Sequence, residues 1–180
     1  LVGETPLSAM TIGSYIEAGH ARLLGLAWDP EALATAILAT RSQERGGGLT
    51  DAFRFVRAQA LLTAHACGIL ALEAPSRDVE DMAAVAETAR RARADGFGGM
   101  LAVHPDQVAA INAAFTPSDD EMREARAIIA AFNANPEASV LQYRGRTIDR
   151  PHLRLAQRRL GLEVKARPDG EQGFPILRPA

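Results

Sequence analysis

Four short apolar runs, each followed by a segment of helical composition, constrain this chain more than any other feature. The runs cover residues 1–4, 22–28, 69–74 and 100–103. Each is apolar along its length rather than alternating, which is typical of parallel strands buried on both faces. A regular alternation of strands and helices favours a parallel sheet with helical crossovers. The sequence therefore predicts an α/β fold.

The helices expected between and after these runs have recognisable ends. Thr5 is a plausible N-cap and Gly19 a stop for the first helix, and Asp78 can cap the fourth. Gly68 and Asp95-Gly96 end the third and fourth helices. The expected helices cover residues 6–18, 31–39, 51–66, 78–94 and 106–115.

The pattern changes after residue 117. Ser118 and Glu121 form a predicted capping box for a helix over 118–133. Residues 138–148 read as two short extended pieces joined around Gly145, and Asp149 is the expected N-cap of a last helix. The sequence therefore predicts three parts: a strand–helix domain over 1–117, a helical extension over 118–160, and a surface tail over 161–180.

Composition narrows the class of protein. The chain has 180 residues, 47% hydrophobic and 23% charged, with a net charge of −2. That balance is ordinary for a soluble globular protein and gives no general electrostatic reason to bind nucleic acid or an anionic membrane. Apolar runs of about 20 residues, the length that spans a bilayer, are absent from the sequence. The single cysteine, Cys67, rules out an internal disulfide framework and fits a reducing compartment, so we expect a cytoplasmic protein with a buried thiol.

Polar groups follow the predicted strands at the edge where parallel α/β folds carry their chemistry. They are Glu4, Asp29, Glu73 and His104. Because neighbouring strands lie about 4.8 Å apart, Glu4 and Asp29 could share one small cation, and two carboxylates favour Mg²⁺. The alternative is that both are ordinary loop residues, or that Asp29 only caps the following helix.

Two further positions could carry chemistry or be structural. His104 precedes Pro105 at the start of a helix, whose backbone N–H groups could favour a phosphate or carboxylate. The alternative for His104 is a structural role in the strand–helix turn. Asp149 could take part in catalysis, and the alternative is that it is only the N-cap of the last helix.

Residues 96–120 carry the pattern GF-x-G-x-x-A-[IV]-HP-x-Q-[IV]-x-x-[IV]-N-x-x-F-[ST]-PS. This pattern resembles the last barrel strand and following helix of the citrate lyase β-subunit-like (HpcH/HpaI aldolase) family. Members are magnesium-dependent carbon–carbon lyases that act mostly on 3-hydroxyacyl-CoA thioesters. The resemblance implies the C-terminal half of a (β/α)8 TIM barrel, with a partial catalytic domain over 1–117 and a helical lid over 118–160.

The resemblance also implies roles for the candidate residues. Glu4 and Asp29 would hold Mg²⁺, with Glu4 also facing the substrate, a CoA thioester that yields an acyl-CoA and a 2-oxo acid. His104 and Pro105 would lie beside the acyl-CoA cleft. Asp149, in a segment that looks like the family's G-x-[MT]-[IV]-D-x-P, would be an acid/base supplied by a neighbouring subunit. A residue acting in trans implies a homo-oligomer, here a trimer or hexamer.

Two other residues match family positions without a settled role. Glu73 stands where the family usually has an aspartate, and we expect it either to support the site or to lie on the surface. Arg57, in a segment like the family's Y-A-R-S, is expected to be structural or a peripheral contact.

Other readings stay open. Leu26, Trp28, Pro30 and Met100 depart from the family pattern, so the alternatives include an inactive structural or CoA-binding relative. Others are a pyruvate-type aldolase on free hydroxy acids and citryl transfer on an acyl-carrier subunit. The chain does not begin with methionine and matches only the family's C-terminal portion, so we expect a longer reading frame or a partner chain to supply the first four strand–helix units and their substrate-binding arginine.

Overall fold

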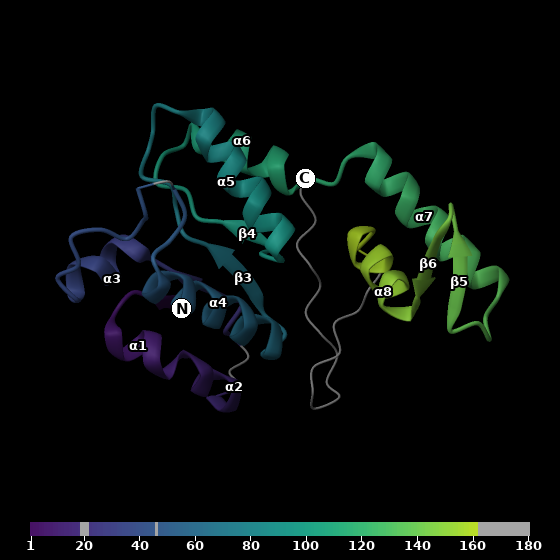
Figure 1. Ribbon diagram of the computed structural model, residues 1–180, viewed down its shortest axis with the longest axis horizontal. Helices are drawn as coiled ribbons and strands as arrows, with labels where there is room; N and C mark the ends of the chain where they lie inside the picture. The colour runs from purple at the N-terminus through teal and green to yellow at the C-terminus, as the bar shows by residue number, and fades with distance from the viewer. Residues whose placement is uncertain (19–21, 46, 162–180) are drawn as a thin grey trace. The chain divides into compact units, whose positions relative to one another are not determined.

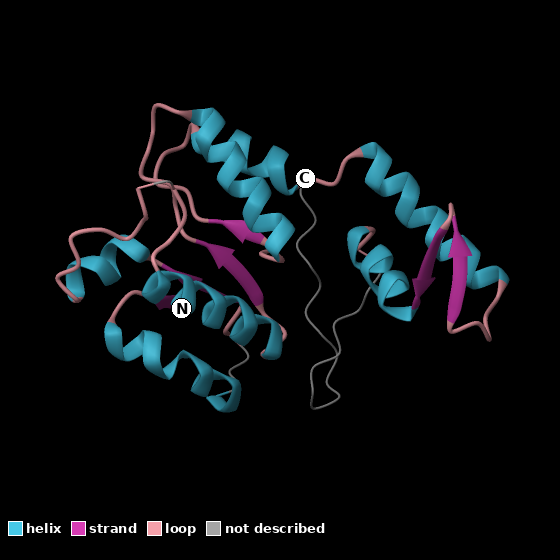
Figure 2. Cartoon of the chain, viewed as in Figure 1, coloured by secondary structure: helices cyan, strands magenta, loops and turns pink. Residues whose placement is uncertain are grey.

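The predicted strands lie side by side in one parallel sheet, in the order in which they occur in the chain. Figures 1 and 2 show two of them, Leu70–Glu73 and Gly99–Met100, beside the helices of the same unit. The computed structural model describes residues 1–18, 22–45 and 47–161. The strands are β1 Val2–Gly3, β2 Gly25–Trp28, β3 Leu70–Glu73 and β4 Gly99–Met100. The α/β class with a parallel sheet is therefore confirmed. The predicted stop at Gly19 and the tail beyond residue 161 lie outside the described residues.

The chain divides into two compact units, Leu1–Thr116 and Pro117–Ala180, and the second is described to residue 161. Within the described ranges, none of the helices combines the length and apolar character needed to cross a membrane. The helical segments of the first unit are α1 Pro6–Thr11, the 3-10 turn η1 Ile12–Ser14, α2 Tyr15–Ala18, α3 Pro30–Ala36, α4 Asp51–Ala66, α5 Met82–Asp95 and α6 Gln107–Phe115.

Several predicted helix ends are wrong, for local reasons. The helix expected over 6–18 is interrupted by η1, which contains Gly13, a weak helix former. The helix expected from Asp78 begins at Met82, because Asp78 accepts the N–H groups of Glu80 and Asp81 in a preceding turn. Asp81 is the actual cap and accepts the N–H of Ala84 at 2.9 Å. The cap at Thr5, in contrast, is confirmed.

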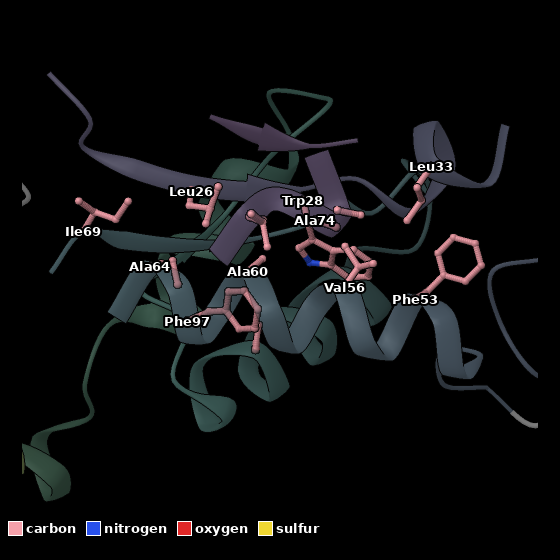
Figure 3. Close-up of a cluster of buried hydrophobic side chains, with 14 of the residues drawn as sticks. Leu26, Trp28, Leu33, Phe53, Val56, Ala60, Ala64, Ile69, Ala74 and Phe97 are labelled. Carbon is pink, nitrogen blue, oxygen red and sulfur yellow. The ribbon is translucent and has the colours of Figure 1, made fainter. Parts of the chain in front are cut away.

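The core of the first unit lies between the sheet and α4. Leu26 and Trp28 alternate along β2, so their side chains share one face of the sheet. Figure 3 shows both projecting toward α4, which brings Val56, Ala60 and other residues to meet them. Leu26 and Trp28 are each 1% exposed, so two of the residues that depart from the family pattern are core residues. The helix α4 therefore fixes the position of β2.

The glycines just before and at the start of β4 allow a close approach of β3. Gly96 has a left-handed backbone (φ +108°), which ends α5 without the steric penalty that a side chain would bring. A Cβ added at Gly98 would lie 2.3 Å from Leu70 Cδ1, and one at Gly99 would lie 2.9 Å from Leu72 Cδ2. The motif glycines thus serve the packing of the sheet.

The second unit is a two-helix and hairpin unit with its own small core. It contains α7 Asp119–Ala134, β5 Val140–Tyr143, β6 Arg146–Asp149 and α8 Arg150–Arg159. The predicted capping box at Ser118 and the hairpin around Gly145 are both confirmed. Arg144 and Gly145 both have positive φ, as a two-residue hairpin turn of type I′ requires. The core residues are Ala125, Ile128, Phe132, Ile148 and Ala156.

Candidate functional site

Glu4 and Asp29 leave neighbouring strands at matching positions. Gly3 lies opposite Trp28 in the pairing of β1 with β2, and the N–H of Asp29 donates to the carbonyl of Gly3 at 3.2 Å. The residues that follow each partner are therefore neighbours at the carboxyl edge of the sheet. Adjacent strands are separated by about 4.8 Å. Two carboxylates consequently start from adjacent backbone positions at that edge.

The two oxygens of Asp29 have different partners. Oδ1 caps α3 by accepting the backbone N–H groups of Glu31 at 2.9 Å and Ala32 at 3.3 Å. Oδ2 faces Nη2 of Arg77 at 2.7 Å. Arg77 comes from the loop between β3 and α5. The cap considered for Asp29 is therefore real, and it leaves Oδ2 as the only oxygen that a further cation could contact without disturbing the helix.

Glu4 is exposed, and within the described residues it makes no hydrogen bond or ion pair. Mg²⁺ in proteins is commonly held by one or two carboxylates, with water and substrate oxygens completing its shell. Groups of three or more histidine, cysteine or acidic residues placed to hold a metal are absent from the described part of the chain. A pair made of Glu4 and Asp29 Oδ2 fits Mg²⁺ bound together with a ligand.

Glu73 is buried beneath this edge and does not lie on the surface. Glu73 is only 4% exposed. Ala27 pairs with Leu72 in the register of β2 with β3, so Trp28 and Glu73 follow one paired position, and the indole Nε1 donates to Glu73 Oε1 at 2.7 Å. The surface reading of Glu73 is therefore wrong. This carboxylate fixes the residue that immediately precedes Asp29.

Arg57 pairs with the other oxygen of Glu73, whose Oε1 also accepts the backbone N–H of Ala74 at 2.9 Å. Its Nε and Nη2 lie 2.7 and 2.5 Å from Glu73 Oε2, and Nη2 also lies 2.8 Å from Asp95. Its guanidinium stacks over the ring of Phe97 at 4.7 Å. Burial alone would lower the pKa of Arg57, but the hydrogen bonds and charges of Glu73 and Asp95 outweigh burial and raise it above its ordinary value. Arg57 is thus a permanent cation that ties α4 to β3.

His104 and Pro105 lie in an exposed turn before α6. His104 Nδ1 accepts the N–H of Asp106 at 3.3 Å, and its ring lies 3.5 Å from the Asp106 carboxylate. The N–H groups of Gln107 and Val108 donate to the carbonyls of His104 and Pro105. These three amides are therefore used within the turn, which is the structural role considered for His104.

Gln107 is a buried polar residue that sequence reasoning missed. Its Oε1 accepts the N–H of Val103 at 3.0 Å, and its Nε2 donates to the carbonyls of Ser76 and Asp78, each at 3.0 Å. The side chain therefore joins the turn before α6 to the loop that carries Arg77. The signals in the sequence were a glutamine in the first turn of a mostly apolar helix and its place in the pattern over residues 96–120.

Replacing Gln107 with leucine is expected to destabilise the first unit by about 3 kcal/mol, because three backbone groups lose a buried partner at once. Urea unfolding followed by the fluorescence of Trp28, the chain's one tryptophan, measures this change. Gln43→Leu, at an exposed position of the same unit, is the control and is expected to change stability by less than about 0.5 kcal/mol. Equal stability of the two variants would contradict the role of Gln107 in joining the turn before α6 to the loop that carries Arg77.

Asp149 begins α8 and pairs with a histidine one turn later. Its Oδ1 accepts the N–H of His152 at 3.3 Å and lies 2.5 Å from His152 Nδ1. The side-chain hydrogen bond from His152 is the main cause that holds the pKa of Asp149 below its ordinary value. The predicted N-cap is confirmed. Its partner was missed, although the three-residue spacing is that of a capping box.

Cys67 and His65, both within the described residues, show no sign of catalytic chemistry. Cys67 is half-buried against the core, and burial raises the pKa of its thiol, which opposes nucleophilic reactivity. His65 Nε2 contacts the carbonyl of Gly96 at 2.9 Å, at the end of α5. His20 lies outside the described residues.

Comparison with known proteins gives a consistent set of relatives. The chain is 33% identical over 134 residues to a citrate lyase subunit β-like protein of Mycobacterium tuberculosis, covering 74% of this chain and 48% of that protein. It is 34% identical over 111 residues to an L-malyl-CoA/β-methylmalyl-CoA lyase of Cereibacter sphaeroides, covering 60% of this chain and 35% of that enzyme. No family model matches the chain.

A solved structure is similar over most of the chain. It is the crystal structure of the protein CitE from Mycobacterium tuberculosis in complex with magnesium, acetoacetate and coenzyme A, with a TM-score of 0.77 and 30% identity. The match covers 88% of this chain and 58% of that one. The chain therefore spans about half or less of the length of the curated relatives it matches.

Proposed function

Because this chain is a homologue of the citrate lyase β-like, malyl-CoA and citramalyl-CoA lyases, matched over part of their length, we propose that it forms the metal-binding part of a carbon–carbon lyase. The reaction is the cleavage, or in reverse the condensation, of a 3-hydroxyacyl-CoA thioester such as malyl-CoA or citramalyl-CoA. The products of cleavage are an acyl-CoA and a 2-oxo acid. In this proposal the first unit is the C-terminal half of a TIM barrel.

The observation that carries the proposal is the placement of Glu4 and Asp29. They leave adjacent parallel strands at matching positions, at the edge where such folds bind ligands. When bound, Mg²⁺ would supply a Lewis acid that polarises the carbonyl of the 2-oxo acid. The similar structure of CitE is a complex with magnesium and acetoacetate, which supports magnesium as the metal of the proposed site.

The remaining roles are proposed on the same basis. Asp149, contributed by a neighbouring copy of the chain in a homo-oligomer, exchanges the proton at the carbon next to the thioester carbonyl. His104 and Pro105 border the part of the site that takes CoA. The side-chain hydrogen bond from His152 holds the pKa of Asp149 below its ordinary value, and the carboxylate is the form that accepts this proton in the condensation direction.

Glu4→Gln is expected to abolish Mg²⁺-dependent cleavage while leaving the fold unchanged. Glu4 is exposed and has no partner among the described residues, so the loss of its charge removes a metal ligand and no structural contact. Mass spectrometry of reactions that contain the product of the complete open reading frame, Mg²⁺ and malyl-, methylmalyl- or citramalyl-CoA measures acyl-CoA release, with and without EDTA. Glu137→Gln, an exposed glutamate of the second unit, is the matched control and should retain full activity.

The same reactions separate the alternatives. Cleavage that persists in Glu4→Gln would exclude Glu4 as a ligand. A folded chain that binds neither Mg²⁺ nor substrate would overturn the lyase proposal in favour of a non-catalytic relative. Turnover of free hydroxy acids without CoA would instead identify a pyruvate-type aldolase.

A further inference from the structure

Arg77 occupies the one oxygen of Asp29 that is available to a cation. We propose that Arg77 is a displaceable counter-ion of the metal site: without metal it neutralises Asp29, and Mg²⁺ must displace it to bind. Arg77 would then set the affinity of the site for Mg²⁺. This inference rests on the proposed function, because it takes Asp29 and Glu4 as the metal ligands.

The oxygens of Asp29 make the competition specific. Oδ1 accepts two backbone N–H groups at the start of α3, so a cation that took it would uncap the helix. Oδ2 lies 2.7 Å from Nη2 of Arg77, within the space that a metal ligated by Oδ2 would need. The side chain of Asp29 is 15% exposed. Arg77 and Mg²⁺ therefore contend for one partly buried oxygen.

The loop that carries Arg77 is held on both sides of this residue. Gln107 donates to the carbonyls of Ser76 and Asp78, which flank Arg77. Asp78 in turn accepts the N–H groups of Glu80 and Asp81. The side chain of Arg77, in contrast, is 54% exposed, and among the described residues it pairs with Asp29. Displacement therefore needs a rotation of one side chain and no movement of the loop.

Charge explains both why Arg77 pairs with Asp29 in the absence of metal and why Mg²⁺ can replace it. Glu4 and Asp29 bring two carboxylates to adjacent strand ends, and one guanidinium offsets part of their repulsion. A divalent cation offsets more and can contact both groups. Because the displaced guanidinium stays on an anchored loop, it also repels the bound metal. Removal of the guanidinium should consequently strengthen the binding of Mg²⁺.

Titration calorimetry with MgCl₂ on the purified chain tests this inference. Arg77→Gln is expected to tighten the Mg²⁺ Kd about fivefold relative to the wild type, as the loss of one partly exposed ion pair predicts. Arg77→Lys, which retains a positive charge, should stay near the wild-type value. Arg90→Gln, an exposed arginine that pairs with Glu87 on α5, is the matched control and should not change the Kd. Thermal melting gives a second reading: Mg²⁺ should raise the melting temperature of Arg77→Gln more than that of the wild type.

The outcomes distinguish the two proposals. If the wild type binds Mg²⁺, Glu4→Gln does not, and Arg77→Gln binds equally well or more weakly, the counter-ion role is overturned and the metal site stands. If no variant binds Mg²⁺, or if Glu4→Gln binds it normally, the metal site itself is overturned and the role of Arg77 with it.

Discussion

Replacing Glu73 with alanine is expected to destabilise the first unit by about 4 kcal/mol, a large part of the stability of a typical domain. The substitution leaves Arg57 largely buried and without its main counter-ion, and it leaves the indole N–H of Trp28 without an acceptor. Breaking a buried ion pair costs about 3–5 kcal/mol. Arg57 is 22% exposed and keeps Asp95, which limits that part of the loss. The unpaired indole N–H adds about 1–2 kcal/mol.

Urea unfolding followed by Trp28 fluorescence measures this change, because Trp28 belongs to the network formed by Glu73, Arg57 and Trp28. A loss of 4 kcal/mol shifts the midpoint by about 2 M if the urea dependence is typical for a unit of this size. Glu73→Gln keeps an acceptor for Trp28 but loses the charge that faces Arg57, so its loss should be about half as large. Glu87→Ala, which breaks exposed pairs on α5, is the control and should cost less than about 1 kcal/mol. A Glu73→Ala chain as stable as this control would show that the network contributes nothing.

The parts of the fold that sequence predicted are those that depend on neighbours along the chain. Thr5, Ser118 and Asp149 cap helices because a polar side chain can reach an N–H group three residues ahead, and such spacing is visible in the sequence. The strands were also visible in the sequence, because each is a run of consecutive apolar residues. Asp78 misled the prediction because two aspartates lie three residues apart, and either can cap a helix. Asp81 does so, while Asp78 holds the preceding turn.

The contacts that could not be predicted depend on the register of the sheet or on side chains in different elements. Glu73 was grouped with the other polar residues after the strands. It is in fact the last residue of β3, and its side chain contacts Trp28 and Arg57. Arg77 reaches Asp29 across 48 residues of sequence. Neither contact has a local spacing that would reveal it. Topology first brings the loops after β2 and β3 to one edge, and only then does Arg77 become a neighbour of Asp29.

Two departures from the family pattern are coupled in the structure. Trp28 stands just before Asp29, and Glu73 replaces a usual aspartate, so each taken alone suggests an altered site. The two are the last residues of the neighbouring strands β2 and β3 and share a hydrogen bond of 2.7 Å. A longer acid thus satisfies the indole N–H of a buried tryptophan. These departures are therefore accounted for by packing beneath the edge, and they leave the position of Asp29 at the end of β2 unchanged.

Replacing Asp149 with asparagine is expected to lower the rate of carbon–carbon bond cleavage in the CoA thioester about 10²–10⁴-fold, the usual contribution of a general acid or base. Asparagine is as good an N-cap as aspartate, so α8 should keep its first turn and circular dichroism should not change. The variant therefore removes the proton-exchanging carboxylate and spares the cap. Asp119→Asn, a substitution in the first turn of α7, is the control and should retain activity. A folded Asp149→Asn chain with wild-type cleavage would remove Asp149 from the mechanism.

His152 provides a second test of Asp149, through pH. Its side-chain hydrogen bond is the main cause of the lowered pKa of Asp149, so His152→Ala should raise that pKa toward its ordinary value. A carboxylate with a lowered pKa stabilises the folded state above its unfolded pKa, and this contribution is lost as the pH falls through the folded value. In His152→Ala the carboxylate should therefore protonate at a higher pH, and the acid limb of the condensation rate should move to higher pH with it. NMR titration of the Asp149 carboxyl carbon gives the pKa directly. If the titration moves and the acid limb does not, the group that limits the rate at low pH is a different one, and Asp149 holds only the helix.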